Sequence, residues 1–266
     1  MKLALKLKTK NNLLPINYNY PLSSAIYKLL QFGSPKFSEY LHSKGYKVNG
    51  KAYKLFSFSL KFSYNKIVNE AFQLSSPNVT LNVTSPIIDD FIKNVISGSL
   101  QRGEFELFNK GTFLLFEIEQ MEEMPEPELN EIQKFFLYSP LVLSTRQDRN
   151  GKSVQHYFEY YDDINDITRV FNNNLINKYK AIYLKDYTGE HLKFNWDTEF
   201  IQKQLAKNRS IKRLIKIEKP NLPTINIISN NIPFRLQGDT ELMKVGYQCG
   251  FGEKNSLGFG MAAKLD

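Results

Sequence analysis

Cysteine and histidine are scarce in this sequence, and their scarcity excludes several kinds of site. The chain has one cysteine, Cys249, and three histidines, His42, His156 and His191. A single cysteine excludes an intrachain disulfide framework and a cysteine-based zinc site. The histidines are widely separated and lack the short spacings of a metal site, so we expect neither a metal nor another cofactor. We interpret Cys249 as a packing residue.

Long apolar runs and nucleotide-binding glycine motifs are also missing. No apolar run approaches the ~20 residues that a membrane-spanning helix requires. The first residues, MKLALKLKTK, are too short and too charged for a signal peptide, so we expect a cytoplasmic protein with no membrane partner. The motifs G-x-x-x-x-G-K-[ST], G-x-S-x-G and an early G-x-G-x-x-G are absent. Their absence argues against a P-loop enzyme, an α/β-hydrolase and a dinucleotide-binding domain.

The composition is that of a globular and basic protein. The chain has 266 residues, of which 42% are hydrophobic, which is enough to bury a core. It carries 35 Lys and Arg against 27 Asp and Glu, a formal net charge of +8. This charge fits a polyanionic partner, either nucleic acid or an anionic membrane surface. It fits an ordinary soluble protein from a Lys- and Asn-rich proteome equally well.

The order of strand and helix patterns predicts two similar α+β domains. Each half mixes strands with crossing helices, which indicates tandem ferredoxin-like (RRM-like) domains, although no sequence repeat is legible. The acidic stretch EIEQMEEMPEPELNE contains a linker that we place at residues 124–131. The amino-terminal domain is then 1–123 and the carboxy-terminal domain 132–266. The alternative is an exposed acidic loop inside one domain.

Two short helices are predicted near the start of the chain. Residues 21–32, PLSSAIYKLLQF, start the first, with Ser23 and Ser24 as candidate caps. Residues 34–44 form the second, with Ser34 as its cap and a proline in its first turn.

A glycine-rich loop, GFGEKNSLGFGM at residues 250–261, stands near the end of the sequence. Glycine permits positive φ and close backbone approach, and successive exposed N–H groups bind anions. With polar side chains among the glycines, a phosphodiester backbone is a suitable ligand. The candidate RNA-binding residues here are Gly250, Gly252, Lys254, Asn255, Ser256, Gly258 and Gly260. The alternatives are a hairpin that joins two strands, or packing against the helix that carries Tyr27.

Basic residues outside this loop extend the predicted interface. Lys212 and Arg213 lie in a basic segment that we predict as a strand with one face suited to phosphates. Arg146 and Lys152 lie in a basic turn at residues 144–153. A solvated strand edge is the competing interpretation of the first segment.

Sequence blocks at both ends of the chain carry a family resemblance. VGYQCGFGEKNSLGFGM resembles the carboxy-terminal signature of the CRISPR-associated endoribonucleases that cut precursor CRISPR RNA within its repeats, the sixth Cas family of the RAMP superfamily. The blocks YNYPLSSAIYKLL, PKFSEYLHSKGY and YKLFSFSL also resemble this family. The resemblance reaches both predicted domains and is thin through residues 63–130 and 145–220.

The resemblance implies a metal-independent cut of RNA. The 2′-hydroxyl attacks the adjacent phosphate and gives a 2′,3′-cyclic phosphate, or a 3′-phosphate, and a 5′-hydroxyl. Such chemistry needs a base, an acid and stabilisation of charge on the phosphorane. The family commonly uses a Tyr, a His and a Lys for these tasks, and the matching positions are Tyr27, His42 and Lys54. Which of them is the acid and which the base stays open.

Each of these residues also has a simpler interpretation. His42 can be an exposed histidine at a helix end, and histidine is a functional candidate because it titrates near neutral pH. Lys54 can be an ordinary strand-edge lysine. Tyr27 can be a buried aromatic residue with a hydrogen-bonded hydroxyl.

An insert separates His42 from Lys54. The segment SKGYKVNGKAY carries three further lysines, and we interpret it as flexible. Any of them could take the place of Lys54: Lys44, Lys47 and Lys51.

The sequence is compatible with three functions. The first is the repeat-cleaving endoribonuclease, with precursor CRISPR RNA as its partner. The second is a catalytically silent RAMP protein that packages this RNA in an effector complex. The third is an unrelated ferredoxin-like RNA-binding protein. The sequence leaves the repeat sequence and the oligomeric state, monomer or homodimer, open.

Overall fold

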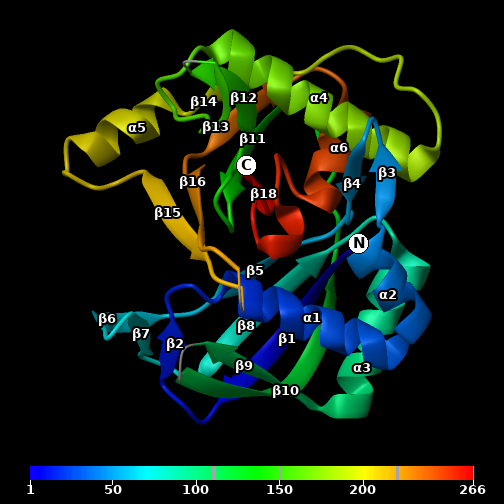
Figure 1. Ribbon diagram of the computed structural model, residues 1–266, viewed down its shortest axis with the longest axis vertical. Helices are drawn as coiled ribbons and strands as arrows, with labels where there is room; N and C mark the ends of the chain where they lie inside the picture. The colour runs from blue at the N-terminus through cyan, green and yellow to red at the C-terminus, as the bar shows by residue number, and fades with distance from the viewer. Residues whose placement is uncertain (110–111, 150, 220–221, 266) are drawn as a thin grey trace.

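The computed structural model describes residues 1–109, 112–149, 151–219 and 222–265. It shows two α+β units stacked along the long axis of the molecule, the first half of the chain below and the second half above (Figure 1). Strand β10 ends at Met124 and β11 begins at Ile132, and an irregular segment joins the two units. The predicted domain boundary at 124–131 stays a proposal.

The amino-terminal unit is built on a five-stranded antiparallel sheet with the order β5-β8-β1-β10-β9. Its strands are β1 (Lys2–Thr9), β5 (Ser57–Lys61), β8 (Asn78–Thr84), β9 (Glu104–Asn109) and β10 (Thr112–Met124). The unit also contains three helices, α1 (Asn19–Gly33), α2 (Pro35–Ser43) and α3 (Lys93–Arg102). A π-helical turn (Ile88–Ile92) precedes α3. A small sheet of β2 (Leu13–Pro15), β6 (Tyr64–Val68) and β7 (Ala71–Leu74) lies beside it.

The carboxy-terminal unit repeats the same plan with a four-stranded sheet, β14-β17-β11-β18. Its strands are β11 (Ile132–Leu137), β14 (Lys193–Trp196), β17 (Phe234–Gln237) and β18 (Ala262–Leu265). The crossing helices are α4 (Ile164–Tyr183) and α6 (Thr240–Cys249), with the shorter α5 (Thr198–Leu205) after β14. The four strands of the β-α-β-β-α-β path are β1, β5, β8 and β10 in the first unit and β11, β14, β17 and β18 in the second. In both sheets these strands lie side by side in the order second, third, first, fourth, which is the ferredoxin-like arrangement.

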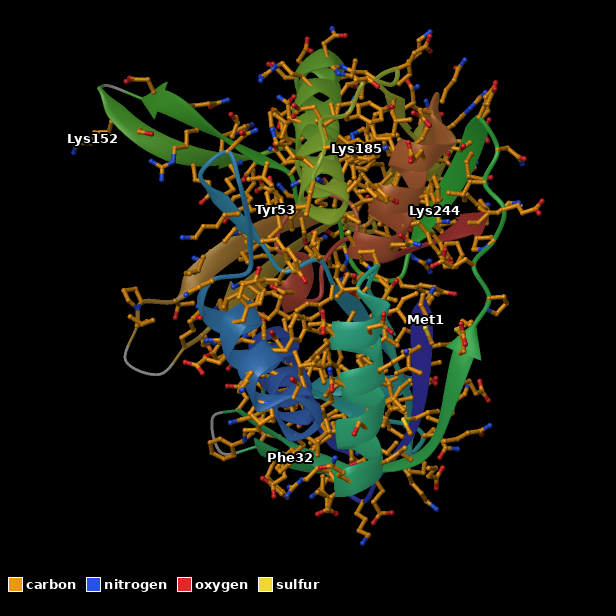
Figure 2. The ribbon with its side chains drawn as sticks, turned by 90° about the vertical axis from the view of Figure 1, so that its right-hand side faces the viewer. Met1, Phe32, Tyr53, Lys152, Lys185 and Lys244 are labelled. Atoms are coloured by element: carbon orange, nitrogen blue, oxygen red, sulfur yellow. The ribbon has the colours of Figure 1, made fainter. Side chains whose placement is uncertain are left out.

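Three hairpins reach out from these sheets. The pair β3 (Tyr46–Val48) and β4 (Lys51–Tyr53) extends from the first unit to α4 of the second (Figure 1). The pair β12 (Ser144–Arg149) and β13 (Lys152–Tyr157) projects from the body of the molecule, with Lys152 close to its tip (Figure 2). The pair β15 (Lys212–Ile217) and β16 (Ile225–Asn230) runs from the second unit toward α1 (Figure 1).

The helix starts partly match the sequence prediction. Ser34 caps α2 as predicted, because its Oγ accepts a hydrogen bond from the backbone N–H of Phe37 at 3.4 Å. The prediction that Ser23 or Ser24 caps the first helix is wrong, since α1 already begins at Asn19 and both serines lie inside it. The Oγ of Ser23 instead donates to the backbone oxygen of Ser256 at 2.6 Å.

Each unit has its own apolar core, and a small third cluster lies where they meet. That cluster consists of Val142, Ile217, Ile227 and Phe259, with Tyr20 of α1 packed against it. The contact joins the β15–β16 hairpin and the glycine-rich loop to the amino-terminal unit. Over the described residues, no helix is both long and apolar enough to cross a membrane.

Candidate active site and nucleic-acid interface

Helices α1 and α2 bring Tyr27 and His42 together. Leu22, Ile26 and Leu29 bury one stripe of α1 in the core, and Tyr27 sits at the edge of that stripe, half-buried. His42 lies in the last turn of α2 and is exposed. The two rings meet edge to face, with their centroids 5.3 Å apart. Burial raises the pKa of Tyr27 far above its usual range, so its phenol stays protonated at neutral pH.

Lys54 joins this pair from the segment between β4 and β5. Its Nζ donates to the backbone oxygens of Leu41 and His42, the latter at 2.8 Å, and so caps the carboxy-terminal end of α2. Burial lowers the pKa of Lys54. The next residue, Leu55, is buried with φ of 52°, a conformation that costs backbone strain in a non-glycine residue. This turn directs Lys54 toward His42 while Leu55 enters the core.

These three side chains line one cavity of about 680 Å³, which we call the Tyr27 pocket. Ser256 of the glycine-rich loop also lines it, and so does Lys219, which follows β15. The structure therefore brings together residues from both units that lie far apart in the sequence. The prediction that Tyr27, His42 and Lys54 are catalytic stays a prediction, but their convergence gives it a geometric basis.

The Tyr27 pocket is rich in cations. Lys28 of α1 and Lys36 of α2 line it together with Lys54 and Lys219, against a single carboxylate, Glu39. Lys219 reaches it because the β15–β16 hairpin rests on α1, where the Lys219 ammonium lies 5.5 Å from the centre of the Tyr20 ring. An excess of cations over anions favours a phosphate ligand.

The glycine-rich loop is docked against the amino-terminal unit. The side-chain amide of Asn19 donates to the backbone oxygen of Leu257 at 2.8 Å, and Ser57 Oγ donates to that of Phe259 at 2.9 Å. Five of its backbone N–H groups are bonded to carbonyls within the protein, those of Phe251, Glu253, Leu257, Gly258 and Gly260. The loop is thus a rigid contact between the two units.

Its four glycines are required by close packing. All four have positive φ, from 67° to 84°. A Cβ atom on Gly252 would lie 2.3 Å from the backbone oxygen of Val142, and one on Gly260 would lie 1.8 Å from that of Phe251. A Cβ on Gly258 would meet the Phe58 ring at 2.6 Å, and one on Gly250 would meet the Asn255 amide, also at 2.6 Å. This gives the glycines a structural role, and their predicted contact with RNA stays a prediction.

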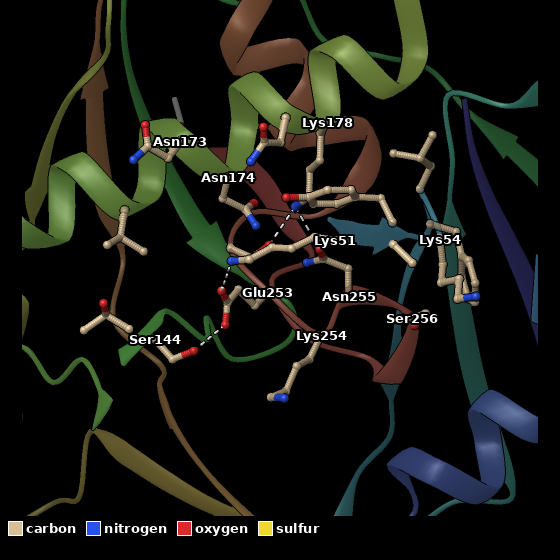
Figure 3. A pocket seen from close by; sticks show the side chains of 18 of the residues that line it. Lys51, Lys54, Ser144, Asn173, Asn174, Lys178, Glu253, Lys254, Asn255 and Ser256 are labelled. Carbon is tan, nitrogen blue, oxygen red and sulfur yellow. Dashed lines mark hydrogen bonds and ion pairs between the residues drawn. The ribbon is translucent and has the colours of Figure 1, made fainter. Parts of the chain in front are cut away.

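A buried lysine holds the loop from the inside. Lys178 of α4 is 2% exposed, and its Nζ donates to the backbone oxygens of Gly250 and Gly252, both at 2.7 Å. Its third bond goes to Asn255 Oδ1 at 2.8 Å, and the Asn255 amide nitrogen donates to Phe251 and Phe259 oxygens at 2.9 Å each (Figure 3). Burial lowers the pKa of Lys178 to about 8, so it remains a cation at neutral pH. The side-chain amide of Asn255 is therefore engaged within the loop.

The other predicted RNA-binding residues are dispersed. Arg146 is exposed and shares a second cavity with Lys254 and Ser256. Lys152 stands on the projecting β12–β13 hairpin (Figure 2). Lys212 is paired with Glu159, with 2.8 Å between Nζ and Oε2, and Arg213 is exposed on the same strand. All of them stay predictions as RNA contacts.

The insert between His42 and Lys54 is an ordered hairpin, which corrects our expectation of flexibility. Its Val48 and Tyr53 are buried in the core of the carboxy-terminal unit. The turn Asn49–Gly50 has φ values of 49° and 75°, which is the two-residue hairpin geometry that an Asn-Gly pair favours. Its lysines lie elsewhere than the Tyr27 pocket: Lys44 and Lys47 are exposed, and Lys51 pairs with Glu253 at 3.8 Å.

Comparison with known proteins places the chain in a family. The family model described as CRISPR associated protein Cas6, C-terminal, matches residues 121–263. The chain belongs to the Cas6 family. The model for the Cas6 N-terminal part matches residues 13–119. Within the described residues, no group of three or more His, Cys, Asp or Glu side chains lies close enough to hold a metal ion.

Relatives match this Cas6 family member over all or nearly all of its length. CRISPR-associated endoribonuclease Cas6 1 of Methanocaldococcus jannaschii is 29% identical over 100% of this chain and 93% of its own. CRISPR-associated endoribonuclease Cas6 of Pyrococcus furiosus is 28% identical over 93% of this chain and 82% of its own. A solved structure named CRISPR associated protein Cas6 has a TM-score of 0.74 at 26% identity and covers 100% of this chain and 99% of that one. The predicted family and fold class are confirmed.

Two lysines of this Cas6 protein escaped the sequence reasoning as site residues. Lys178 falls on the buried face of α4, three residues beyond Leu175 and seven beyond Phe171, and a lysine on an apolar stripe is a signal for a buried polar role. Lys219 is the last basic residue of the segment that we predict to contact phosphates, but only the path of the β15–β16 hairpin brings it to the Tyr27 pocket.

Proposed function

We propose that this chain is an endoribonuclease that cuts precursor CRISPR RNA within its repeats. The convergence of Tyr27, His42 and Lys54 in one cation-rich pocket carries the proposal. The pocket adjoins the glycine-rich loop through Ser256, so an RNA strand that enters it lies against both units. The names of the Methanocaldococcus and Pyrococcus relatives support the same activity.

The chemistry that suits this pocket is attack by the ribose 2′-hydroxyl on the adjacent phosphate. His42 takes the proton of the 2′-hydroxyl, since a ring nitrogen of a neutral imidazole accepts protons as a general base. Tyr27 donates its proton to the leaving 5′-oxygen, because its raised pKa makes the phenolate unavailable as a base. The bond from phosphorus to the 5′-oxygen breaks as the bond to the 2′-oxygen forms. A proton passed from His42 back to Tyr27 restores both groups.

Lys54 stabilises the charge that develops on phosphorus. Two of its N–H groups are held by the carbonyls of Leu41 and His42, which leaves its third for a phosphate oxygen. Lys28, Lys36 and Lys219 contribute further positive charge around the same cavity. Ionic contacts of this kind position the phosphate without reading sequence.

The alternative function is a RAMP protein that binds repeat RNA without cutting it. The capping bonds of Lys54 favour it, because they give this lysine a structural reason to be present that needs no catalysis. Membership of a larger effector complex and a homodimeric state stay predictions. The size of the RNA-bound species in solution decides both.

The test is the chemical nature of the products. End-labelled repeat RNA is incubated with the protein in EDTA, and the new ends are identified. The proposal expects one cut that leaves a 2′,3′-cyclic phosphate or 3′-phosphate and a 5′-hydroxyl, and no cut when the nucleotide before the scissile bond is 2′-deoxy. Cleavage of the 2′-deoxy substrate contradicts the proposed chemistry. Tight binding without cleavage establishes the packaging alternative.

A further inference from the structure

Helix α1 carries a polar stripe that runs from the glycine-rich loop to the Tyr27 pocket. Asn19, Ser23 and Tyr27 are spaced four residues apart, which places them on one face of the helix. Asn19 and Ser23 are 5% and 4% exposed. The short helical turn of the loop (Asn255–Leu257), drawn in red, contacts α1 (Figure 1). The stripe thus connects the loop of one unit to a candidate catalytic side chain of the other.

Ser23 does not use its hydroxyl as a helical serine commonly does. The hydroxyl of a serine inside a helix commonly donates to the backbone oxygen four residues earlier. The neighbouring Ser24 does this with Tyr20 at 3.1 Å. The Oγ of Ser23 donates instead to the backbone oxygen of Ser256 at 2.6 Å. Because serine is a weaker helix former than alanine, the bond to the glycine-rich loop, and not the helix, gives this buried hydroxyl its role.

The bond from Ser23 lies at the wall of the Tyr27 pocket. Two other side chains of the amino-terminal unit, Asn19 and Ser57, also donate to backbone oxygens of the loop, at 2.8 and 2.9 Å. Neither of these two lines the pocket, whereas Ser23 and Ser256 both do. The Ser23 bond therefore joins the two units at the cavity where we place the reaction.

Both ends of this bond belong to rigid parts of the molecule. On one side, Lys178 holds the loop from within the carboxy-terminal unit. On the other side, Ser23 precedes Tyr27 by about one helical turn, a rise of about 6 Å along the axis. The helix between them is packed into the core of the amino-terminal unit. The bond therefore sets how far the glycine-rich loop stands from Tyr27 and His42.

We propose that Ser23 is a positioning residue for RNA cleavage, which holds the glycine-rich loop at the distance from Tyr27 that aligns a phosphate between them. Ser23 takes no part in proton transfer, because its hydroxyl donates to the Ser256 oxygen. Misplacement of reacting groups by about 1 Å can slow a reaction by about 10²-fold. Loss of the bond therefore affects the chemical step more than RNA affinity, since the cations of the pocket stay in place. The inference rests on the proposed function, because it takes Tyr27 and His42 to be the reacting groups.

The experiment separates the chemical step from binding. Wild type, Ser23→Ala and the control Ser99→Ala are compared by affinity for repeat RNA, single-turnover cleavage rate at saturating RNA, and melting temperature. Ser99 is a matched control, since it is 1% exposed in α3 and its Oγ has no hydrogen-bond partner among the described residues. We expect Ser23→Ala to cut about 10–100 times more slowly at saturating RNA, with an affinity within about twofold of wild type. We expect Ser99→Ala to keep the wild-type rate and affinity.

The rates are compared at a temperature at which all three proteins are folded, so a loss of stability alone leaves them equal. A wild-type rate in Ser23→Ala at saturating RNA overturns the positioning role and leaves the proposed function intact, whether or not affinity or melting temperature falls. An equal loss of rate in Ser99→Ala also overturns it, because the effect is then not specific to the bond with the loop. Wild type that does not cut repeat RNA overturns the proposed function and this inference with it.

Discussion

Replacing Lys178 by methionine removes the cation that holds the glycine-rich loop while it keeps most of the side-chain volume. The ammonium donates three hydrogen bonds, to the backbone oxygens of Gly250 and Gly252 and to Asn255 Oδ1, at 2.7–2.8 Å. All three acceptors would stay buried without this donor. The glycine-rich loop contributes Lys254 to the second cavity, of about 630 Å³, and Ser256 to both that cavity and the Tyr27 pocket. We therefore expect the substitution to change RNA binding as well.

The size of the effect follows from opposing contributions. A hydrogen bond from a charged group contributes about 1.5–3 kcal/mol. The cost of burying the cation opposes the stabilisation from these three hydrogen bonds. The lowering of the Lys178 pKa from 10.5 to about 8 puts this cost at roughly 3 kcal/mol. Each buried acceptor that is left without its donor costs about 1–3 kcal/mol. We therefore expect Lys178→Met to lower the free energy of unfolding by about 3–5 kcal/mol.

Urea denaturation followed by circular dichroism measures this change. The control is Lys180→Met on the same helix, whose exposed pair with Asp186, 2.6 Å apart, contributes about 0–1 kcal/mol. The affinity for repeat RNA is measured in the same samples under folding conditions. If Lys178→Met unfolds within about 1 kcal/mol of Lys180→Met, the reasoning about the buried ammonium is refuted.

Three further predictions follow from the same structure. Between about pH 8 and 10.5 the unfolded chain keeps a proton at Lys178 that the folded chain releases, so the free energy of unfolding of wild type rises with pH relative to that of Lys178→Met. If denaturation at several pH values gives both proteins the same slope of unfolding free energy against pH, the lowered pKa is contradicted. Tyr27→Phe keeps the buried ring, so cleavage should slow about 10²–10⁴-fold at unchanged RNA affinity, and an undiminished single-turnover rate counts against a role in proton transfer. Lys219→Met should weaken RNA binding and reduce its salt dependence by about one ionic contact, and an unaltered slope of affinity against salt argues that Lys219 touches no phosphate.

Local signals in the sequence predict much of the fold. The alternation of Leu and Lys in the first residues predicts a strand, and these residues form the central strand β1. The Ser34–Pro35 pair starts α2 as expected. The convergence of Tyr27 and His42 follows from two short helices joined at Ser34, so the resemblance and the geometry agree. The helix start at Asn19 was missed because Tyr18, at the N-cap, makes no capping bond through its side chain.

Most contacts between the two units were beyond the reach of the sequence, although packing of the glycine-rich loop against the helix that carries Tyr27 was one of the alternatives and is observed. The Asn49–Gly50 turn is a strong hairpin signal, but nothing local shows that Val48 and Tyr53 enter the core of the other unit. The glycine pattern suggested a backbone ligand, whereas the nearest neighbours of the four glycines are main-chain atoms and the side chains of Phe58 and Asn255 in the protein itself. Such contacts depend on the relative position of the units, which periodicity does not encode.

The most direct test of the account is the single-turnover cleavage rate of repeat RNA by wild type, His42→Ala and His191→Ala, measured in EDTA with binding followed in parallel. His191 is exposed and lies in the carboxy-terminal unit, so its substitution is the matched control. The account predicts one cut by wild type and His191→Ala, and its loss in His42→Ala while the RNA stays bound. Cleavage by His42→Ala at the wild-type rate would contradict the claim that the Tyr27 pocket is the active site.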